Sequence, residues 1–135
     1  MKKEFITYEH AFALKELGFE EPCLFHILGG EINFYRSTQD YFPKNDRNGI
    51  GCSAILYQQA FRWFREKHNL CGEVYTVNMG AIDYTFLIRD LYNEDVKYNN
   101  FEVYTGGYSG TFNTYEESEG ACLDKLIEIV KNKQD

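Results

Sequence analysis

Three segments of the chain carry apolar side chains at the spacing of an amphipathic helix. The first begins after Thr7, a good N-cap residue, and ends at Gly18, where a left-handed conformation is expected. The second begins at Ser53, its expected N-cap, and ends near Asn69. The third begins at a capping box in residues 114–117 and runs into a charged tail. The pattern therefore predicts three helices.

Five further segments are typical of strands, because they are rich in β-branched and aromatic residues or alternate apolar with polar positions. They are residues 23–28, 31–35, 73–79, 82–91 and 101–105. Two glycine-containing turns, at residues 29–30 and 80–81, join the first two and the next two of these strands as hairpins.

The order of these elements is α-β-β-α-β-β-β-α. It predicts an α+β fold in which three helices pack on an antiparallel sheet of about five strands. The chain has 135 residues, which suffice for one hydrophobic core, so we expect a single domain over residues 1–135. Residues 37–51 are a long polar loop, and loops of this length in a small domain are functional or mobile.

Composition and charge narrow the possible functions. The net charge is −7, which disfavours binding to a phosphate backbone, so we expect no nucleic-acid partner. The apolar runs are too short to span a membrane, and the first residues do not resemble a signal peptide. The four cysteines are scattered, which favours free thiols over disulfides. We therefore expect a cytoplasmic protein.

Two Cys–His pairs raise the question of a zinc site. Cys23 and His26 are three residues apart, as are His68 and Cys71, and these four side chains are all possible Zn²⁺ ligands. However, the first pair lies on a predicted strand, where residues three apart point to opposite faces. We therefore expect no metal site.

No group of residues indicates catalysis. Nothing in the spacing selects one cysteine and one histidine as nucleophile and base, and the carboxylate pairs lie at helix starts or in loops. The glycine-rich run 105–111 lacks the residues of a phosphate-binding loop or a dinucleotide-binding loop, so it is interpreted as a bulge or turn. The sequence thus argues against an enzyme and gives no catalytic residue or cofactor.

One face of the predicted sheet is a candidate for partner binding. If the helices cover the other face, alternation leaves this one to Thr85, Leu87, Arg89, Glu102 and Tyr104. A mixture of one aliphatic, one aromatic and two charged side chains is typical of a protein-binding patch. We expect a protein partner or self-association here. The alternative is that the first hairpin or the loop 37–51 covers this face.

Residues 53–132 resemble the double-stranded-RNA-binding domain in the order helix, three strands, helix. The glycine at 110 and the segment that follows it lead into the last helix in a similar way. That family binds phosphate with lysines at the start of its last helix, whereas this chain has Glu116, Glu117 and Glu119 there. The resemblance therefore implies the topology without the RNA-binding chemistry.

A second resemblance extends over the whole chain. Residues 5–9, 14–19, 57–67, 114–117, 122–123 and 125–128 are similar to segments of small uncharacterised proteins encoded by tailed phages and by the gut bacteria that host them. The resemblance implies a phage or prophage accessory protein in the cytoplasm of a bacterial host. It assigns no functional residues.

Two function classes remain as hypotheses. The first is a non-enzymatic accessory protein that binds a host or phage protein, consistent with the small size and the missing catalytic set. The second is a small-ligand binder, for example one that sequesters a nucleotide signal in an aromatic-lined pocket, since 17% of the residues are aromatic. A degenerate double-stranded-RNA-binding-like module is a further alternative.

Overall fold

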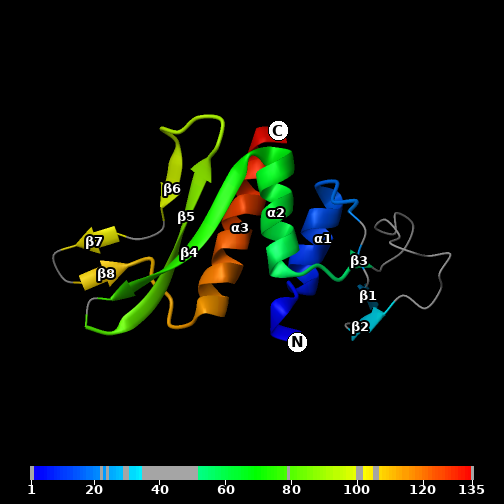
Figure 1. Ribbon diagram of the computed structural model, residues 1–135, viewed down its shortest axis with the longest axis horizontal. Coiled ribbons are helices and arrows are strands. Elements are labelled where there is room, and N and C mark those ends of the chain that lie inside the picture. The colour runs from blue at the N-terminus through cyan, green and yellow to red at the C-terminus, as the bar shows by residue number, and fades with distance from the viewer. Residues whose placement is uncertain are drawn as a thin grey trace. The chain divides into compact units, whose positions relative to one another are not determined.

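The structure is a computed structural model, shown in Figure 1. It describes residues 2–21, 23, 25–28, 31–34, 52–78, 80–99, 102–104 and 107–134. The predicted loop 37–51 lies outside these residues. The chain divides into two compact units, Met1–Ala60 and Phe61–Asp135, and each unit is described by itself. The expectation that residues 1–135 form one domain remains a prediction.

The N-terminal unit contains a short 3₁₀ helix, η1 (Lys2–Glu4), one α-helix, α1 (Tyr8–Glu16), and a small sheet. The sheet consists of β1 (Phe25–Leu28), β2 (Glu31–Phe34) and β3 (Cys52–Ser53), in the antiparallel order β2-β1-β3. The register of β1 and β2 pairs Leu28 with Glu31, which confirms the predicted hairpin. The buried side chains of the N-terminal unit include Phe5, Ile6, Leu14, Phe19, Ile27 and Ile55.

Both ends of α1 follow from local sequence. The His10 N–H donates to the Thr7 hydroxyl oxygen at 3.3 Å, so Thr7 is the N-cap, as predicted. At the other end Gly18 adopts a left-handed conformation with φ 98°, and the Phe19 N–H donates to the Leu14 carbonyl at 2.9 Å. Together with the hydrogen bond that the Gly18 N–H donates to the Lys15 carbonyl at 3.1 Å, this bond forms a Schellman motif, which ends the helix.

The start of the second helix differs from the prediction. Ser53 is not the N-cap of α2 (Tyr57–His68); it lies in β3, where it is paired with His26 and fully buried. The chain stays extended for several more residues because the Ile6 N–H donates to the Ile55 carbonyl at 2.9 Å. Backbone pairing with residues distant in sequence thus overrides the capping tendency of a serine. The end near Asn69 is confirmed by its φ of 56°.

The C-terminal unit holds the larger sheet. Its strands β4 (Leu70–Asn78), β5 (Ile82–Asp90) and β6 (Lys97–Asn99) are antiparallel in the order β4-β5-β6. A separate hairpin joins β7 (Glu102–Tyr104) and β8 (Gly107–Ser109), so the glycine-rich run forms part of a hairpin. The last helix, α3 (Tyr115–Gln134), packs chiefly on β4 and β5 (Figure 1).

The core of this unit lies between α3 and the sheet. Its fully buried side chains include Phe64, Leu70, Ile88, Cys122, Leu123 and Leu126. The Glu117 N–H donates to the Thr114 hydroxyl oxygen at 3.1 Å, so Thr114 is the N-cap of α3 that the sequence predicts. No helix in the described ranges is both long and apolar enough to cross a membrane.

The α+β class and the predicted order of helices and strands are confirmed. The strands are distributed over separate antiparallel sheets, with three short strands, β3, β6 and β8, where the pattern indicated none. Alternation of apolar and polar residues indicates that a segment is a strand, and it indicates which residues share a face. It does not indicate which other strand pairs with that segment.

Candidate binding groove

The structure brings together only some of the five residues that were predicted to form one partner-binding face. Thr85 is fully buried, and its hydroxyl donates to the Gly110 carbonyl at 2.7 Å, so its predicted place on an exposed face is wrong. Leu87 is half-buried. Arg89 is exposed and forms an ion pair with Glu73 at 3.8 Å.

The other two residues of that prediction lie in β7. Glu102 is paired with Ser109 of β8, and Tyr104 with Gly107, in a hairpin separate from the β4-β5-β6 sheet. The side chains of Glu102 and Tyr104 are outside the part of the chain that the structure describes. The role of these residues in partner binding therefore stays a prediction.

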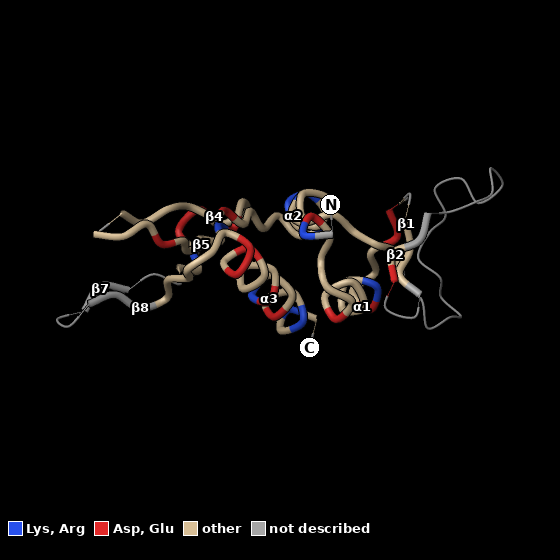
Figure 2. Tube along the Cα trace, turned by 90° about the horizontal axis from the view of Figure 1, so that it is seen from below, with Lys and Arg blue, Asp and Glu red and all other residues tan. Residues whose placement is uncertain are grey.

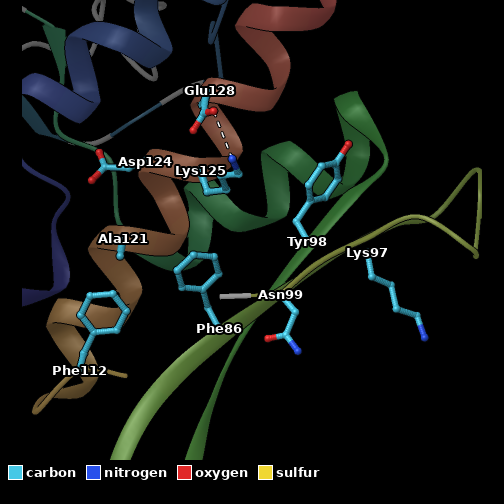
Figure 3. A pocket seen from close by; sticks show the side chains of 9 residues that line it. All are labelled: Phe86, Lys97, Tyr98, Asn99, Phe112, Ala121, Asp124, Lys125 and Glu128. Atoms are coloured by element: carbon cyan, nitrogen blue, oxygen red, sulfur yellow. Dashed lines mark hydrogen bonds and ion pairs between the residues drawn. The ribbon is translucent and has the colours of Figure 1, made fainter. Parts of the chain in front are cut away.

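A groove lies elsewhere in the same unit, between α3 and the strands β5 and β6 (Figure 3). Its volume is about 590 Å³, and it is open to solvent along one side. The lining residues come from β5, β6, the segment before α3, and α3 itself. They are Phe86, Lys97, Tyr98, Asn99, Phe112, Ala121, Asp124, Lys125 and Glu128.

Aromatic rings form the floor of the groove. Phe86 of β5 is almost fully buried and stacks on Phe112, with ring centroids 6.5 Å apart and an angle of 23° between the planes. Phe112 is held in place because its N–H and carbonyl exchange hydrogen bonds with Tyr84, at 2.7 and 2.9 Å. Ala121 faces these rings from α3, and its small side chain leaves the groove open (Figure 3).

One rim of the groove is charged. Asp124, Lys125 and Glu128 lie on consecutive turns of α3, and the Lys125 ammonium forms an ion pair with the Glu128 carboxylate at 3.1 Å. Asp124 and Glu128 are exposed. The α3 rim thus carries two carboxylates and one cation, and that cation is already paired.

The other rim is β6. Tyr98 is paired with the fully buried Ile88, so its side chain lies on the face of the sheet that α3 covers. Lys97 and Asn99 alternate with it. Lys97 also lines the groove, and Figure 3 shows its side chain extending away from α3.

This arrangement combines apolar with charged surface. The nine lining residues are three aromatic residues, two carboxylates, two lysines, one asparagine and one alanine. The floor offers apolar surface, and the α3 rim offers charge. These are the two components that fix affinity and orientation in a binding site.

Two of the cysteines, Cys23 and Cys122, are buried thiols with a raised pKa. Burial, together with Cys71 and Glu119 nearby, raises the pKa of the Cys122 thiol to about 12. Burial also raises the pKa of Cys23, whose sulfur accepts a hydrogen bond from the Gln59 amide at 3.4 Å. Thiols with a raised pKa are poor nucleophiles at neutral pH.

The four possible zinc ligands all lie in the part of the chain that the structure describes. No group of three or more His, Cys, Asp or Glu residues there is placed to hold a metal ion. His68 instead packs against Trp63 and Phe64, with ring centroids 4.8 and 5.9 Å away. Its Nε2 is buried without a hydrogen-bond partner, and burial lowers its pKa, which favours the neutral form of the ring.

Sequence reasoning missed the groove for identifiable reasons. Tyr98 and Phe112 lie outside the predicted helices and strands, so their contribution to a surface was not anticipated. One signal was readable: Ala121, Asp124 and Glu128 recur at helical spacing on one side of α3. A small residue followed by charged ones on one helical face indicates a side that is not packed in the core.

Comparison of the chain with protein-family models, with curated proteins and with solved structures finds no match.

Proposed function

We propose that this protein is a non-enzymatic accessory protein that binds a partner protein through the groove between α3, β5 and β6. The observation that carries the proposal is the anatomy of the groove, an aromatic floor beside a charged rim. Interfaces have this organisation, with an apolar centre that takes an anchoring side chain and a polar rim.

The floor is preorganised for such an anchor. Phe112 is fixed by two backbone hydrogen bonds, and Phe86 belongs to the central strand of the sheet. Little backbone freedom is therefore lost when a ligand is bound, which increases the net affinity of each contact. Burying one Leu- or Phe-sized side chain here would contribute about 1.5–3 kcal/mol.

The resemblance to small phage and prophage proteins suggests that the partner is a host or phage protein in the bacterial cytoplasm. The RNA-binding alternative has less support, because Glu116 and Glu117 are exposed at the start of α3. Carboxylates at that position repel a phosphate backbone.

A small-ligand binder is the second candidate function. The groove volume of about 590 Å³ is within the range of small-molecule sites, and its aromatic rings could stack on a base. Native mass spectrometry of freshly purified protein separates the two candidates. A stoichiometric small molecule that is lost in a groove variant would favour the second candidate.

Peptide selection tests the protein-binding proposal directly. Random peptides of about 15 residues, long enough to cross an interface of ordinary size, are displayed and selected against the full chain. Their affinities are then compared for the wild type and for Ala121→Arg, which fills the groove. The matched control is Asn132→Arg, which places the same side chain at an exposed site near the end of α3. We expect selected peptides to lose binding to Ala121→Arg alone; peptides that bind both variants equally would contradict the proposal.

A further inference from the structure

We infer that two copies of this chain pair through the outer edges of their β4 strands, with Tyr75 of one copy opposite Tyr75 of the other. The groove is lined by β5 and β6, whereas β4 forms the other edge of the same sheet. The inference therefore goes beyond the proposed function and does not depend on it. It is carried by the backbone groups that β4 directs away from β5.

β4 is an edge strand in the part of the chain that the structure describes. It pairs with β5 along its whole length and with no other described strand. Its first residue, Leu70, is fully buried. Toward the hairpin turn, Tyr75, Thr76 and Asn78 are exposed. The accessible part of this edge is therefore residues 74–78.

Hydrogen bonds on the far side of β5 show which backbone groups of β4 point outward. The Tyr84 N–H and carbonyl both bond to Phe112, so they point away from β4. Thr76 is the residue opposite Tyr84. In an antiparallel pair, two opposite residues either exchange both hydrogen bonds or both direct their backbone groups away from each other. Thr76 therefore directs its N–H and carbonyl to the outer edge, and by alternation Val74 and Asn78 do the same.

This edge lacks the features that keep sheet edges from pairing. Native proteins protect an exposed edge with charged residues, with proline or with a bulge. Residues 74–78 contain no charged residue and no proline, so this part of β4 is tan in Figure 2. The register between β4 and β5 continues without a bulge from one end of β4 to the other. Valine, tyrosine and threonine also favour the extended conformation. This edge is therefore suited to pairing with a further strand.

A second copy of β4 complements this edge. With a twofold axis at Tyr75, antiparallel pairing places Val74 of each copy opposite Thr76 of the other, so outward backbone groups meet outward backbone groups. Glu73 is the charged residue of β4, and it lies opposite Val77 of the second copy, so no like charges face each other. An axis at Glu73 would instead place two carboxylates opposite each other.

The two Tyr75 side chains meet at the axis of this dimer. Tyr75 directs its own backbone groups to β5, so the two tyrosines form a pair without mutual hydrogen bonds, in which the Cα atoms are about 4.5 Å apart. Side chains are closest in such pairs, and each Tyr75 is 37% exposed in the single chain. Cross-strand aromatic pairs stabilise sheets. Each β4 edge is used once, so the assembly closes as a dimer.

Sedimentation of the full chain over a range of concentrations, with the thiols kept reduced, tests this inference. We expect the wild type to show a monomer–dimer equilibrium. Tyr75→Lys removes the aromatic pair and places two ammonium groups opposite each other, so it should raise the dissociation constant of the dimer at least about tenfold. The matched control is Tyr92→Lys, the same substitution at a side chain that is 86% exposed and outside the strands. It should change the constant less than about twofold.

A charge exchange tests the register. Tyr75→Lys and Tyr75→Glu should each be weakened as homodimers, but an equimolar mixture should form a heterodimer, because opposite charges then face each other at the axis. Circular dichroism checks that each variant is folded. If Tyr75→Lys is unfolded, Tyr75→Thr replaces it, with a rise of at least about twofold from the loss of the aromatic pair.

The outcomes are distinct from those of the groove experiments. A wild type that stays monomeric at about 1 mM, an open-ended polymer, or a dimer that Tyr75→Lys and Tyr92→Lys weaken equally would overturn the inference. Ala121→Arg should leave the dimer intact, and a dimer that it abolishes would show association through the groove instead. Selected peptides that lose binding to Tyr75→Lys, in a chain that is itself monomeric, would show that β4 pairs with a strand of another protein rather than with a second copy.

Discussion

Gly72 of β4 tests how closely α3 packs on the sheet. A Cβ atom added at this position would lie 2.8 Å from the Cys122 sulfur. It would also lie 3.2 Å from Leu126 Cδ1 and 3.2 Å from Phe61 Cε1. The first of these distances is shorter than any ordinary contact, so the helix or the strand must move in Gly72→Ala. Glycine at this point of β4 thus permits the close approach of α3.

The expected change in the free energy of unfolding follows from two opposing effects. Overpacking of a core by one methyl group costs about 1–3 kcal/mol. Replacing glycine by alanine also restricts the unfolded chain, which offsets about 0.4–1 kcal/mol of that cost. We therefore expect Gly72→Ala to lower the free energy of unfolding by about 1–2 kcal/mol. The measurement is urea unfolding followed by circular dichroism, with the thiols kept reduced.

A second substitution tests whether the contact with the Cys122 sulfur causes this loss of stability. In a Cys122→Ala background the sulfur is absent, so Gly72→Ala should cost less there than in the wild type, with a coupling of at least about 0.5 kcal/mol. Gly80→Ala is the control, because Gly80 has open space around it but a φ of 107°. Its cost comes from the backbone, and Cys122→Ala should not reduce it. A neutral Gly72→Ala, or equal costs in both backgrounds, would refute this account of the packing.

Three further predictions concern α3 and β5. Thr114→Ala should cost about 1 kcal/mol in thermal or urea unfolding because α3 loses its N-cap, whereas Thr114→Ser should be nearly neutral; equal stabilities would exclude the cap. Burial raises the pKa of Glu119 from 4.5 to about 7, so the folded state holds more protons than the unfolded state between these values. The stability that this group contributes therefore falls as the pH rises from 4.5 to 7, and Glu119→Gln should flatten that part of the pH profile of the melting temperature. Thr85→Val should cost about 1–2 kcal/mol, since the Gly110 carbonyl loses a bond of 2.7 Å; a neutral effect would show that water replaces the hydroxyl.

The features that sequence predicts correctly depend on contacts within a few residues. Thr7 caps α1 through the N–H three residues later, and Gly18 ends the same helix through bonds that reach back to Leu14. Ser53 has the same capping chemistry, but it is held in β3 by residues far away in sequence. A capping signal is therefore reliable only where no strand competes for the same backbone groups.

The same limit applies to the prediction of the groove from the sequence. Alternation along β5 correctly separates the buried Phe86 and Ile88 from the exposed Arg89. It does not tell what covers each face, and Thr85 is buried on the side that was expected to be free. The groove arises on the other side, because α3 packs chiefly on β4 and β5 and an aromatic floor next to β6 stays accessible. A binding surface in a domain this small is therefore determined by the length and angle of a helix relative to its sheet. Neither quantity is encoded in the periodicity of a single element.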